Sequence, residues 1–536
     1  MRAADVLARR LAEAGCRYAF GMPGGEVLTL LDAFERAGIR FILCKHENYA
    51  GFMAEGVYHM TGAPGILLAT IGPGIANGFN VVANAEQDRV PLIAVTGCLD
   101  AHEEQNYTHQ IFNHRAAFEA VTKANFRFDA KAAEIIADKA VSIAMSKRRG
   151  PVLLDVPISV AAMDIGAPKP VRRAPEPPMQ PAPSAALDEA KSLISKAKKP
   201  IMVAGLDVLD DPGAVDALSA FCHQHQMPLV TTYKAKGIMP ESDPLVLGGA
   251  GLSPIADQII MPVIEQADLI MLAGYDPIEM RAGWCDPWDP ALVPVIEIAA
   301  ETNRHYVHQA SMSFIGDIGA TLKALTPHAA HATNWTNGAI ADAKHALSTA
   351  FKQGEVWGPT AIVETTRQVL PDDAVVTIDS GAHRILASQV FEARAPRTIL
   401  QSTGLCTMGC ALPLAMGAKL ASPDRAVACF TGDGGLFMVM GELSTAAEHG
   451  LALPVIVFVD SQLALIEKKQ RGMQLKSAGI DFKPLDIAKI GTAMGGYGVT
   501  VRDRDALAGA IRGALAADSF TLIACEIPPS SYDDRI

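Results

Sequence analysis

The sequence predicts an α/β protein of three domains, each with a central, mostly parallel sheet flanked by helices. Short apolar runs recur along the whole chain, helix-length amphipathic stretches separate them, and one proline-rich segment interrupts the pattern. Apolar runs between amphipathic helices are typical of parallel strands that are buried on both faces. The length of 536 residues fits roughly three or four domains.

Eleven apolar runs are the predicted strands. They are residues 41–43, 66–69, 92–95 and 152–156 in the first domain, 201–204, 229–232 and 269–272 in the second, and 375–378, 427–430, 455–459 and 522–525 in the third. Ligands of open parallel sheets bind beyond the carboxyl ends of the strands. Residues that directly follow these runs are therefore the first candidates for a functional site.

Two segments break this pattern. Seven of the sixteen residues 168–183 are proline, which predicts an extended linker because proline is excluded from the interior of helices and sheets. Polar, alanine-rich sequence precedes the third series of strands. The predicted organisation is a first domain at 1–165, a linker at 166–184, a middle domain at 185–327, a linker at 328–357 and a third domain at 358–536.

The charge balance excludes several kinds of partner. Lys and Arg number 46 and Asp and Glu 58, giving a formal charge of −12, which argues against nucleic acid or an anionic membrane surface. No apolar run approaches the ~18 to 20 residues of a membrane-spanning helix. The nine cysteines form no C-x-x-C pair, which predicts reduced thiols and a cytoplasmic location. The charged share of 19% is below the usual value of roughly 25%, so we expect self-association.

The most specific local pattern is a glycine-rich turn after the predicted strand 427–430. Gly432, Gly434 and Gly435 surround Asp433 just before a predicted helix. Glycines at such a turn let main-chain N–H groups approach a phosphate, and a helix N-terminus favours negative charge. Because an aspartate cannot attract phosphate, the pattern indicates a divalent cation between Asp433 and a diphosphate. The alternative is an ordinary tight turn.

A second carboxylate follows the next predicted strand. Asp460 comes directly after residues 455–459 and lies 27 positions beyond Asp433, which leaves room for one helix and one return strand. Both carboxylates then emerge at the same edge of the sheet and can share one hard cation. The alternative for Asp460 is a helix cap.

G-D-G followed by a second acid or amide at this spacing resembles the cofactor motif of thiamine diphosphate enzymes. The resemblance implies a Mg²⁺ site formed by Asp433, Asp460 and the main-chain carbonyl of Gln462, with Leu463 beside the cofactor. The family usually has an amide immediately before the second ligand. Here Val459 loses that amide, whereas Asp460 keeps the ligand.

The first domain carries the second part of the resemblance. Its segments resemble the pyrimidine-binding domain of acetolactate synthases in order and spacing, namely His46-Glu47, Ala50-Gly51, residues 53–56, Gly72-Pro73-Gly74 and Asn77. The cofactor reacts after its C2 atom loses a proton, and a carboxyl group bonded to N1′ of the pyrimidine promotes that loss. The resemblance implies this role for Glu47 and cofactor contacts from Gly72 and Asn77. Without it, a glutamate at a helix start would be explained by the helix dipole.

Four further contacts are implied by the resemblance. Ala382 and His383 follow the predicted strand 375–378 and correspond to the segment that contacts the diphosphate. Met408 corresponds to the methionine that bends the cofactor, and the carbonyl of Cys406 to the acceptor of the 4′-amino group. The family often has glycine at this cysteine, a change that a main-chain contact tolerates.

The resemblance covers nearly the whole chain, and its middle segment is most similar to catabolic acetolactate synthases, which use thiamine diphosphate without FAD. It implies a carboligase that decarboxylates a 2-oxo acid such as pyruvate and joins the product to a second 2-oxo acid or an aldehyde. FAD is not expected. In the resembling enzymes the cofactor lies between the first domain of one subunit and the third domain of another, so we expect a homodimer or homotetramer.

Few proton donors are expected near the reacting carbon. A simple decarboxylase must protonate the carbon that loses CO₂, and such enzymes have an acid after Pro-Gly and an adjacent histidine pair. Here Gly25 stands at the position of the acid, and His102, His109 and His114 are not adjacent, which favours carboligation. Gln110 aligns with a glutamine near C2 and is a candidate contact to the substrate, its alternative being a loop residue.

Lys469 leaves the acceptor open. It stands where biosynthetic synthases have tryptophan and catabolic ones glutamine, and it could pair with a substrate carboxylate or simply face solvent. A non-oxidative 2-oxo acid decarboxylase or C–C lyase on the same cofactor is the main alternative function. A non-catalytic homologue is disfavoured by the intact acids, and a nucleotide-dependent dehydrogenase by the lack of a G-x-G-x-x-G after a strand.

Overall fold

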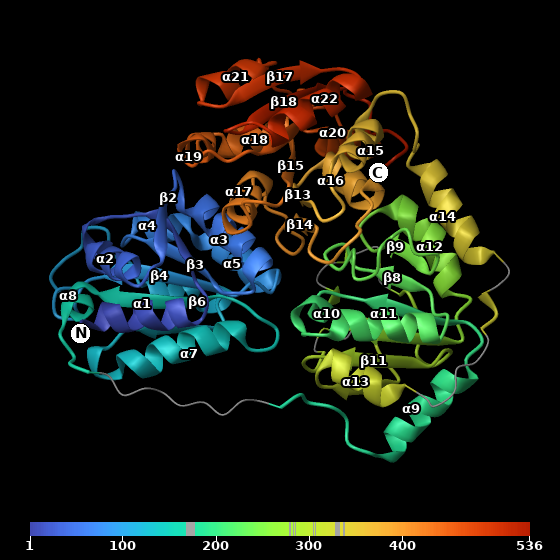
Figure 1. The fold of residues 1–536 in the computed structure, drawn as a ribbon, viewed down its shortest axis with the longest axis horizontal. Helices are drawn as coiled ribbons and strands as arrows, with labels where there is room; N and C mark the ends of the chain where they lie inside the picture. Colours follow the sequence, from blue (N-terminus) through green and yellow to red (C-terminus); the bar gives the residue numbers. More distant parts are fainter. Residues whose placement is uncertain are drawn as a thin grey trace.

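Three six-stranded parallel sheets, one for each third of the chain, form the framework of the computed structural model (Figure 1). The structure describes residues 1–167, 177–277, 280, 281, 284, 286–303, 305, 307–326, 333–335 and 338–536. In Figure 1 the first domain lies at the left, the middle domain at the right and the third domain at the top. The predicted α/β class with three parallel sheets is confirmed.

The first domain has the strand order β2-β1-β3-β4-β6-β5. Its strands are β1 (Tyr18–Met22), β2 (Arg40–Leu43), β3 (Gly65–Ala69), β4 (Leu92–Cys98), β5 (Ala124–Arg127) and β6 (Val152–Pro157). Its helices are α1 (Ala3–Glu13), α2 (Leu28–Arg36), α3 (Glu47–Thr61), α4 (Pro73–Asn77), α5 (Phe79–Gln87), α6 (His114–Phe118), α7 (Ala133–Met145) and α8 (Ile158–Ala162). Strands β3 and β4 are buried along their whole length, because helices cover both faces of a parallel sheet.

The middle domain has the order β12-β11-β10-β7-β8-β9. Its strands are β7 (Pro200–Ala204), β8 (Leu229–Thr231), β9 (Val246–Gly249), β10 (Leu269–Ala273), β11 (Val295–Ala299) and β12 (Met312–Ile315). Its helices are α9 (Ala185–Lys196), α10 (Asp207–Asp210), α11 (Ala214–Gln224), α12 (Pro254–Ile264) and α13 (Ile318–Leu325). Helix α14 (Ala339–Ala350) leads from it to the third domain.

The third domain has the order β14-β13-β15-β16-β18-β17. Its strands are β13 (Val375–Ile378), β14 (Ile399–Gln401), β15 (Val427–Gly432), β16 (Pro454–Val459), β17 (Tyr497–Val501) and β18 (Thr521–Glu526). Its helices are α15 (Pro359–Val369), α16 (Ala382–Val390), α17 (Ala411–Ala421), α18 (Asp433–Val439), α19 (Glu442–Glu448), α20 (Ala464–Gly472), α21 (Ile487–Ala493) and α22 (Arg504–Leu515). Counted in chain order, its strands follow the same sequence as those of the first domain.

All eleven predicted runs overlap strands, and most of the strands that the sequence missed, namely β5, β9, β12, β14 and β17, lie at the edges of their sheets. Strands β5, β12 and β17 are covered less completely and need no continuous apolar run. Strands β9 and β14 are largely buried but have only four and three residues. Gly21 and Glu297 interrupt the two interior strands that were missed, β1 and β11. The predicted linkers 166–184 and 328–357 lie partly outside the described residues, and the domain bounds stay predictions.

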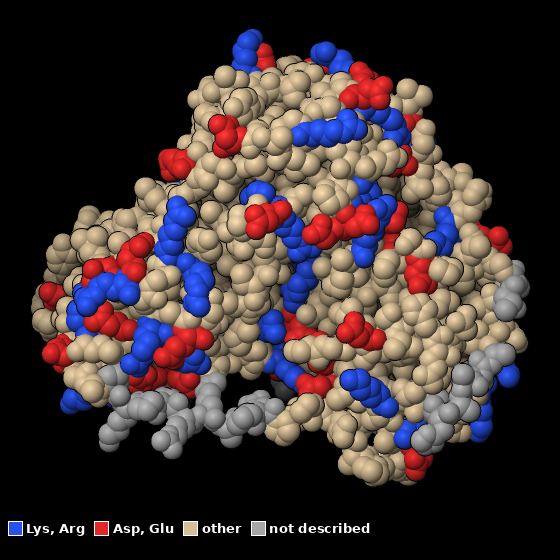
Figure 2. Space-filling view, in the orientation of Figure 1, with Lys and Arg blue, Asp and Glu red and all other residues tan. Residues whose placement is uncertain are grey.

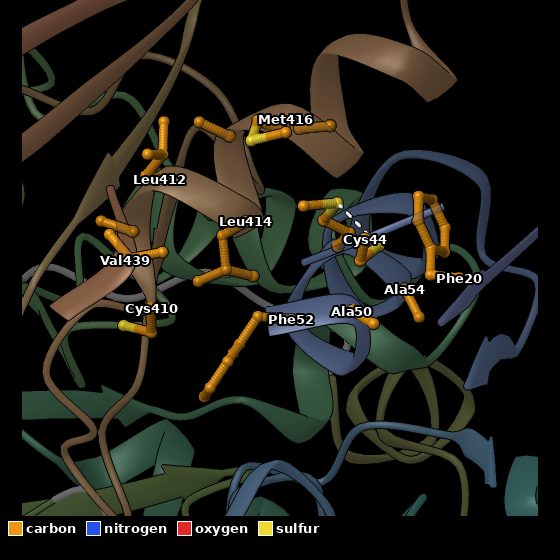
Figure 3. Close-up of a cluster of buried hydrophobic side chains, with 14 of the residues drawn as sticks. Phe20, Cys44, Ala50, Phe52, Ala54, Cys410, Leu412, Leu414, Met416 and Val439 are labelled. Carbon is orange, nitrogen blue, oxygen red and sulfur yellow. Dashed lines mark hydrogen bonds between the residues drawn. The ribbon is translucent and has the colours of Figure 1, made fainter. Parts of the chain in front are cut away.

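Helices α3 and α17 join the first domain to the third. Figure 3 shows their side chains in one apolar cluster, with Phe52 of α3 beside Leu414 of α17. The main chains come close because both helices have glycine at the contact. A side chain at Gly56 would collide with the main-chain oxygen of Leu414, and one at Gly417 with that of Met53. The two domains therefore pack through one shared core.

The surface carries both signs of charge. On the face drawn in Figure 2, Lys and Arg side chains are interspersed with Asp and Glu. Within the described part of the chain, no helix combines the length and apolar character needed to cross a bilayer.

Candidate active site

A cavity of about 660 Å³ opens at the carboxyl ends of β13, β15 and β16. Segments 380–385, 432–435 and 460–466 line it. The middle domain closes one side with Leu252, Pro254 and Arg281, among others. This position agrees with the rule that open parallel sheets bind ligands beyond their strand ends.

Asp433 and Asp460 lie together in this cavity. Asp433 accepts the main-chain N–H groups of Gly434 at 2.8 Å and Ser461 at 2.7 Å, and Asp460 accepts that of Gln462 at 3.3 Å. Burial, followed by the negative charge of Asp433, raises the pKa of Asp460 to about 7. Two buried like charges raise each other's cost of ionisation, and a cation between them would remove that cost.

The donor set fits a hard divalent cation only with help from a ligand. Among the described residues no group of three or more His, Cys, Asp and Glu side chains could hold a metal. The predicted set has two carboxylates and the main-chain carbonyl of Gln462, so it leaves positions for phosphate oxygens and water. Ser461, between Asp460 and Gln462, has a φ of +59°, which is rare for a residue with a side chain.

Two buried polar atoms without hydrogen-bond partners belong to residues that line the same cavity as the carboxylates. Neither Nε2 of His383 nor Oγ of Ser380 has a hydrogen-bond partner among the described residues, and both side chains line the cavity. Burial, followed by the charge of Arg384, lowers the pKa of His383 to about 3, so the ring is neutral and carries one N–H. It stacks on Phe458. Unpartnered polar atoms at the start of α16 leave hydrogen-bonding capacity for a ligand, and a helix start favours an anion such as a diphosphate.

The segment around Cys406 and Met408 borders the same cavity. Cys406 has a φ of +55°, a strained conformation for a residue with a β-carbon. The N–H of Gly409 donates to Asp379 at 2.8 Å, and Asp379 also accepts from Thr431 Oγ1 at 2.8 Å. Asp379, which is fully buried, therefore ties this segment to the ends of β13 and β15.

The first domain holds the other predicted residues. Glu47 begins α3 and is only 4% exposed. Asn77 Nδ2 donates to its Oε2 at 3.0 Å. Gln110, with a φ of +60°, packs against Gly72 so closely that a side chain at Gly72 would collide with its carbonyl. Gly25 is exposed shortly after the end of β1, and a side chain added there would meet no atom within 4 Å.

Within one chain, the site residues predicted in the first domain and those predicted in the third domain do not line a common cavity. Among the described residues, the lining of the 660 Å³ cavity includes Lys469 and Leu463 but none of Glu47, Gln110 and Gly25. The third domain thus has a cavity with two carboxylates at its strand ends. The first domain offers a separate buried carboxylate.

Sequence reasoning missed several residues of the site. Tyr532 and Ile536 line the cavity, and Lys468 bonds the main-chain oxygen of Ile536. No local pattern marks these residues, because they reach the cavity from the end of the chain. Glu26 was also missed. Its Oε2 accepts from Thr70 Oγ1 at 2.5 Å, and its position directly after Gly25 could have drawn attention to it.

Three family models match the chain, each describing one part of a thiamine pyrophosphate enzyme. The N-terminal TPP binding domain matches residues 1–118, the central domain 187–325 and the C-terminal TPP binding domain 379–525. The acetolactate synthase of Bacillus subtilis is 30% identical over 100% of this chain and 94% of its own length. The chain belongs to the acetolactate synthase family of thiamine diphosphate enzymes.

Family members of similar identity have different named activities. The catabolic acetolactate synthase of Raoultella terrigena is 28% identical over 99% of this chain and 95% of its own length. A probable 2-ketoarginine decarboxylase of Pseudomonas aeruginosa is 30% identical over 98% of this chain and 93% of its own length. The choice between ligation and simple decarboxylation therefore rests on the residues of the site.

Proposed function

We propose that the protein is a thiamine diphosphate- and Mg²⁺-dependent carboligase. It decarboxylates a 2-oxo acid such as pyruvate and joins the remaining carbon unit to a second 2-oxo acid or an aldehyde, and FAD takes no part. The observation that carries the proposal is a single cavity in which the paired carboxylates Asp433 and Asp460 lie with the unpartnered polar atoms of Ser380 and His383.

The third domain holds the charged end of the cofactor. Asp433, Asp460 and the carbonyl of Gln462 bind Mg²⁺, which removes the repulsion between the two carboxylates. The diphosphate is held by His383 and by the segments that border the cavity, namely Ala382, Gly432, Gly434, Gly435 and Leu463. The carbonyl of Cys406 and the side chain of Met408 support the pyrimidine.

The first domain supplies the acid. Bound thiamine diphosphate provides the electron sink that lets a 2-oxo acid lose CO₂. Glu47 holds a proton at N1′ of the pyrimidine, and Asn77 fixes its carboxyl group by the bond to Oε2. Gly72 packs against Gln110 in this half of the site and contacts the cofactor, and Gln110 contacts the substrate. The exposed Gly25 leaves space for it.

A complete site requires two copies of the chain. Glu47 lies outside the cavity that holds Asp433 and Asp460 of the same chain. It therefore acts on cofactor bound in the cavity of a second copy, within a homodimer or homotetramer. Large apolar side chains are exposed near both halves, including Leu43 at 47% and Met438 at 54%. Exposed apolar residues grouped near a site are typical of a subunit interface.

Lys469 supplies a free positive charge to the substrate end. It is exposed on α20, lines the cavity, and makes no ion pair within the described residues. Lys468 and Arg281, which also line the cavity, are held by Ile536 and Asp257. We therefore assign the pairing with a substrate carboxylate to Lys469.

Simple decarboxylation is the second candidate, and Glu26 is the observation that favours it. A decarboxylase has to protonate the carbon that loses CO₂. Glu26 and Glu47 both border the Thr70–Gly74 turn, since Thr70 bonds Glu26 and a side chain at Gly74 would touch Thr70 and Glu47. Glu26 is thus a candidate acid for that protonation.

Product analysis separates the two functions. The full-length protein is incubated with pyruvate, thiamine diphosphate and Mg²⁺, and the products are identified by mass. Acetolactate is the expected product, acetaldehyde alone would favour the decarboxylase, and absence of both would remove pyruvate as the donor. Glu26→Gln is then the informative variant, because it should leave ligation intact and slow protonation.

A further inference from the structure

One helix of the first domain carries a stripe of polar residues that all bond the same segment of the third domain. Asn80, Asn84 and Asp88 are four positions apart along and just after α5, so they lie on one face of the helix. Asn80 Oδ1 accepts from Thr407 Oγ1 at 3.1 Å. Asn84 Oδ1 accepts from Ser402 Oγ at 2.5 Å.

Asp88 makes the largest number of these bonds. It accepts the main-chain N–H groups of Thr403 at 3.2 Å and Gly404 at 2.8 Å, and the Thr403 hydroxyl at 2.9 Å. Asp88 is 2% exposed. Asp88 Oδ2 also lies 3.4 Å from Nζ of Lys234, with which it forms an ion pair. Buried, charge-assisted bonds of this kind fix main-chain position more strongly than neutral ones.

The orientation of Asn84 is also fixed. Its Nδ2 donates to Glu55 Oε2 at 3.2 Å, so its oxygen is the end that faces Ser402. Ser402 Oγ in turn accepts the main-chain N–H of Thr407 at 3.2 Å. The chain of bonds thus runs from α3 through α5 to the residue between Cys406 and Met408.

We propose that α5 is a positioning element for segment 402–408, which presents Cys406 and Met408 to the cofactor cavity. The inference rests on the proposed function for the role of that segment. Cys406 holds an unfavourable φ of +55°, which persists only where the surroundings over-determine it. The bonds from Asn80, Asn84 and Asp88 supply that constraint. Asn77, just before α5, bonds Glu47, so one run of chain touches both halves of the cofactor machinery.

The test uses Asn84→Ala in the full-length protein. Tyr58→Phe is the matched control, because Tyr58 makes a buried interdomain bond to Asp210 at 2.8 Å and none to segment 402–408. Asn80→Ala, at an exposed position, serves as a second variant in case Asn84→Ala does not fold. The readouts are amide hydrogen exchange of 402–408 without cofactor, the near-ultraviolet circular dichroism of bound cofactor, and kcat and KM.

We expect exchange at Thr403, Gly404 and Thr407 to rise about tenfold in Asn84→Ala and to stay unchanged in the control. We expect kcat at saturating cofactor to fall about tenfold or more, with an altered cofactor spectrum, because misplacement by about 1 Å is costly in an active site.

Unchanged exchange in a folded variant overturns the link between α5 and the segment. Faster exchange with unchanged kcat and spectrum overturns the positioning role. If the wild type binds no thiamine diphosphate, the proposed function fails and the inference fails with it.

Discussion

The first and third domains have the same strand order but carry different chemistry. In the third domain, the ends of β15 and β16 bear Asp433 and Asp460. In the first domain, the corresponding ends of β3 and β4 are followed by Thr70 and Leu99, which are not acids. The first domain instead places its carboxylate, Glu47, after β2. Under the proposed function, one sheet design serves the charged end of a cofactor in the third domain and proton transfer in the first.

The correspondence extends to how each domain holds the other. The turn after β2 carries Glu47, and Glu442 of α19 in the third domain accepts the N–H groups of Lys45 at 2.8 Å and His46 at 3.0 Å. The turn after β14 is segment 402–408, and α5 of the first domain holds it. Helices α5 and α19 occupy corresponding places in the two domains. Each of the two similar domains thus holds in place a turn of the other domain.

The largest expected effect comes from the carboxylate of the first domain. Glu47→Gln should lower turnover by about 10² to 10⁴-fold, because the amide cannot hold or release the proton. Cofactor and Mg²⁺ affinity should stay close to wild type, measured by equilibrium titration. Glu119→Gln, at an exposed position on the same domain, is the control and should change neither quantity. Full activity in Glu47→Gln would end the assignment.

The corresponding substitution of a carboxylate in the third domain should weaken cofactor binding. Asp433→Asn should weaken Mg²⁺-dependent binding of thiamine diphosphate by about 10 to 100-fold, because one charged metal ligand is lost. Titration calorimetry with and without Mg²⁺ measures the effect. Asp424→Asn, on the surface before β15, should bind as the wild type does. Equal affinity of Asp433→Asn and wild type would exclude Asp433 as a ligand.

The next largest effect should come from the contact between helices α3 and α17, which joins the two domains. Gly56→Ala places a methyl group against the main-chain oxygen of Leu414 and should destabilise the fold by about 1 to 3 kcal/mol. Gly509→Ala on α22 meets open space and should stabilise by about 0.5 to 1 kcal/mol. Thermal and denaturant unfolding compare the two. A stability loss in both variants would show that the helix contact is not the cause.

A smaller effect concerns the pH dependence of stability. Burial raises the pKa of Glu55 from 4.5 to about 8, against a lowering contribution from Lys234 and a further raising one from Asp88. His59 and Asn84 also face it. Between pH 4.5 and about 8, the Glu55 carboxyl group keeps its proton in the folded chain but has released it in the unfolded chain. Stability should therefore fall as pH rises from 4.5 to about 8, with an upper limit of about 1.4 kcal/mol per pH unit.

Glu55→Gln tests this directly. The neutral amide has no proton to release, so denaturant unfolding of the variant should lose this component of the slope and retain more stability than the wild type near pH 8. Identical slopes in the two proteins would show that Glu55 is ionised in the folded state.

The smallest effect is expected at the substrate end. Lys469→Gln should raise KM for an anionic substrate about threefold to tenfold with little change in kcat, because an exposed charge pair is weak. Lys476→Gln, exposed beyond the same helix, is the control. An unchanged KM for every substrate tested would place Lys469 among ordinary surface lysines.

Local patterns revealed the fold class and the residues on strand ends. Asp433 and Asp460 became candidates because each directly follows an apolar run, whereas Glu47 became one only through the resemblance of its segment to the pyrimidine-binding domain. The bonds that hold them could not be found in the same way. Asn84 and Ser402 are 318 positions apart, so only the packing of the domains brings them together. The orphaned hydroxyl of Ser380 likewise has no signature in the sequence.

The most direct test of the central claim, that each active site joins the first domain of one copy to the third domain of another, is complementation between two variants, assayed at a cofactor concentration too low for Asp433→Asn to bind it. Glu47→Gln and Asp433→Asn are mixed under conditions that exchange subunits, and turnover of pyruvate is measured against each variant alone. In a mixed dimer one of the two sites has both wild-type residues. We expect the equal mixture to regain about a quarter of wild-type activity. No recovery in a mixture shown to have exchanged subunits would contradict the claim.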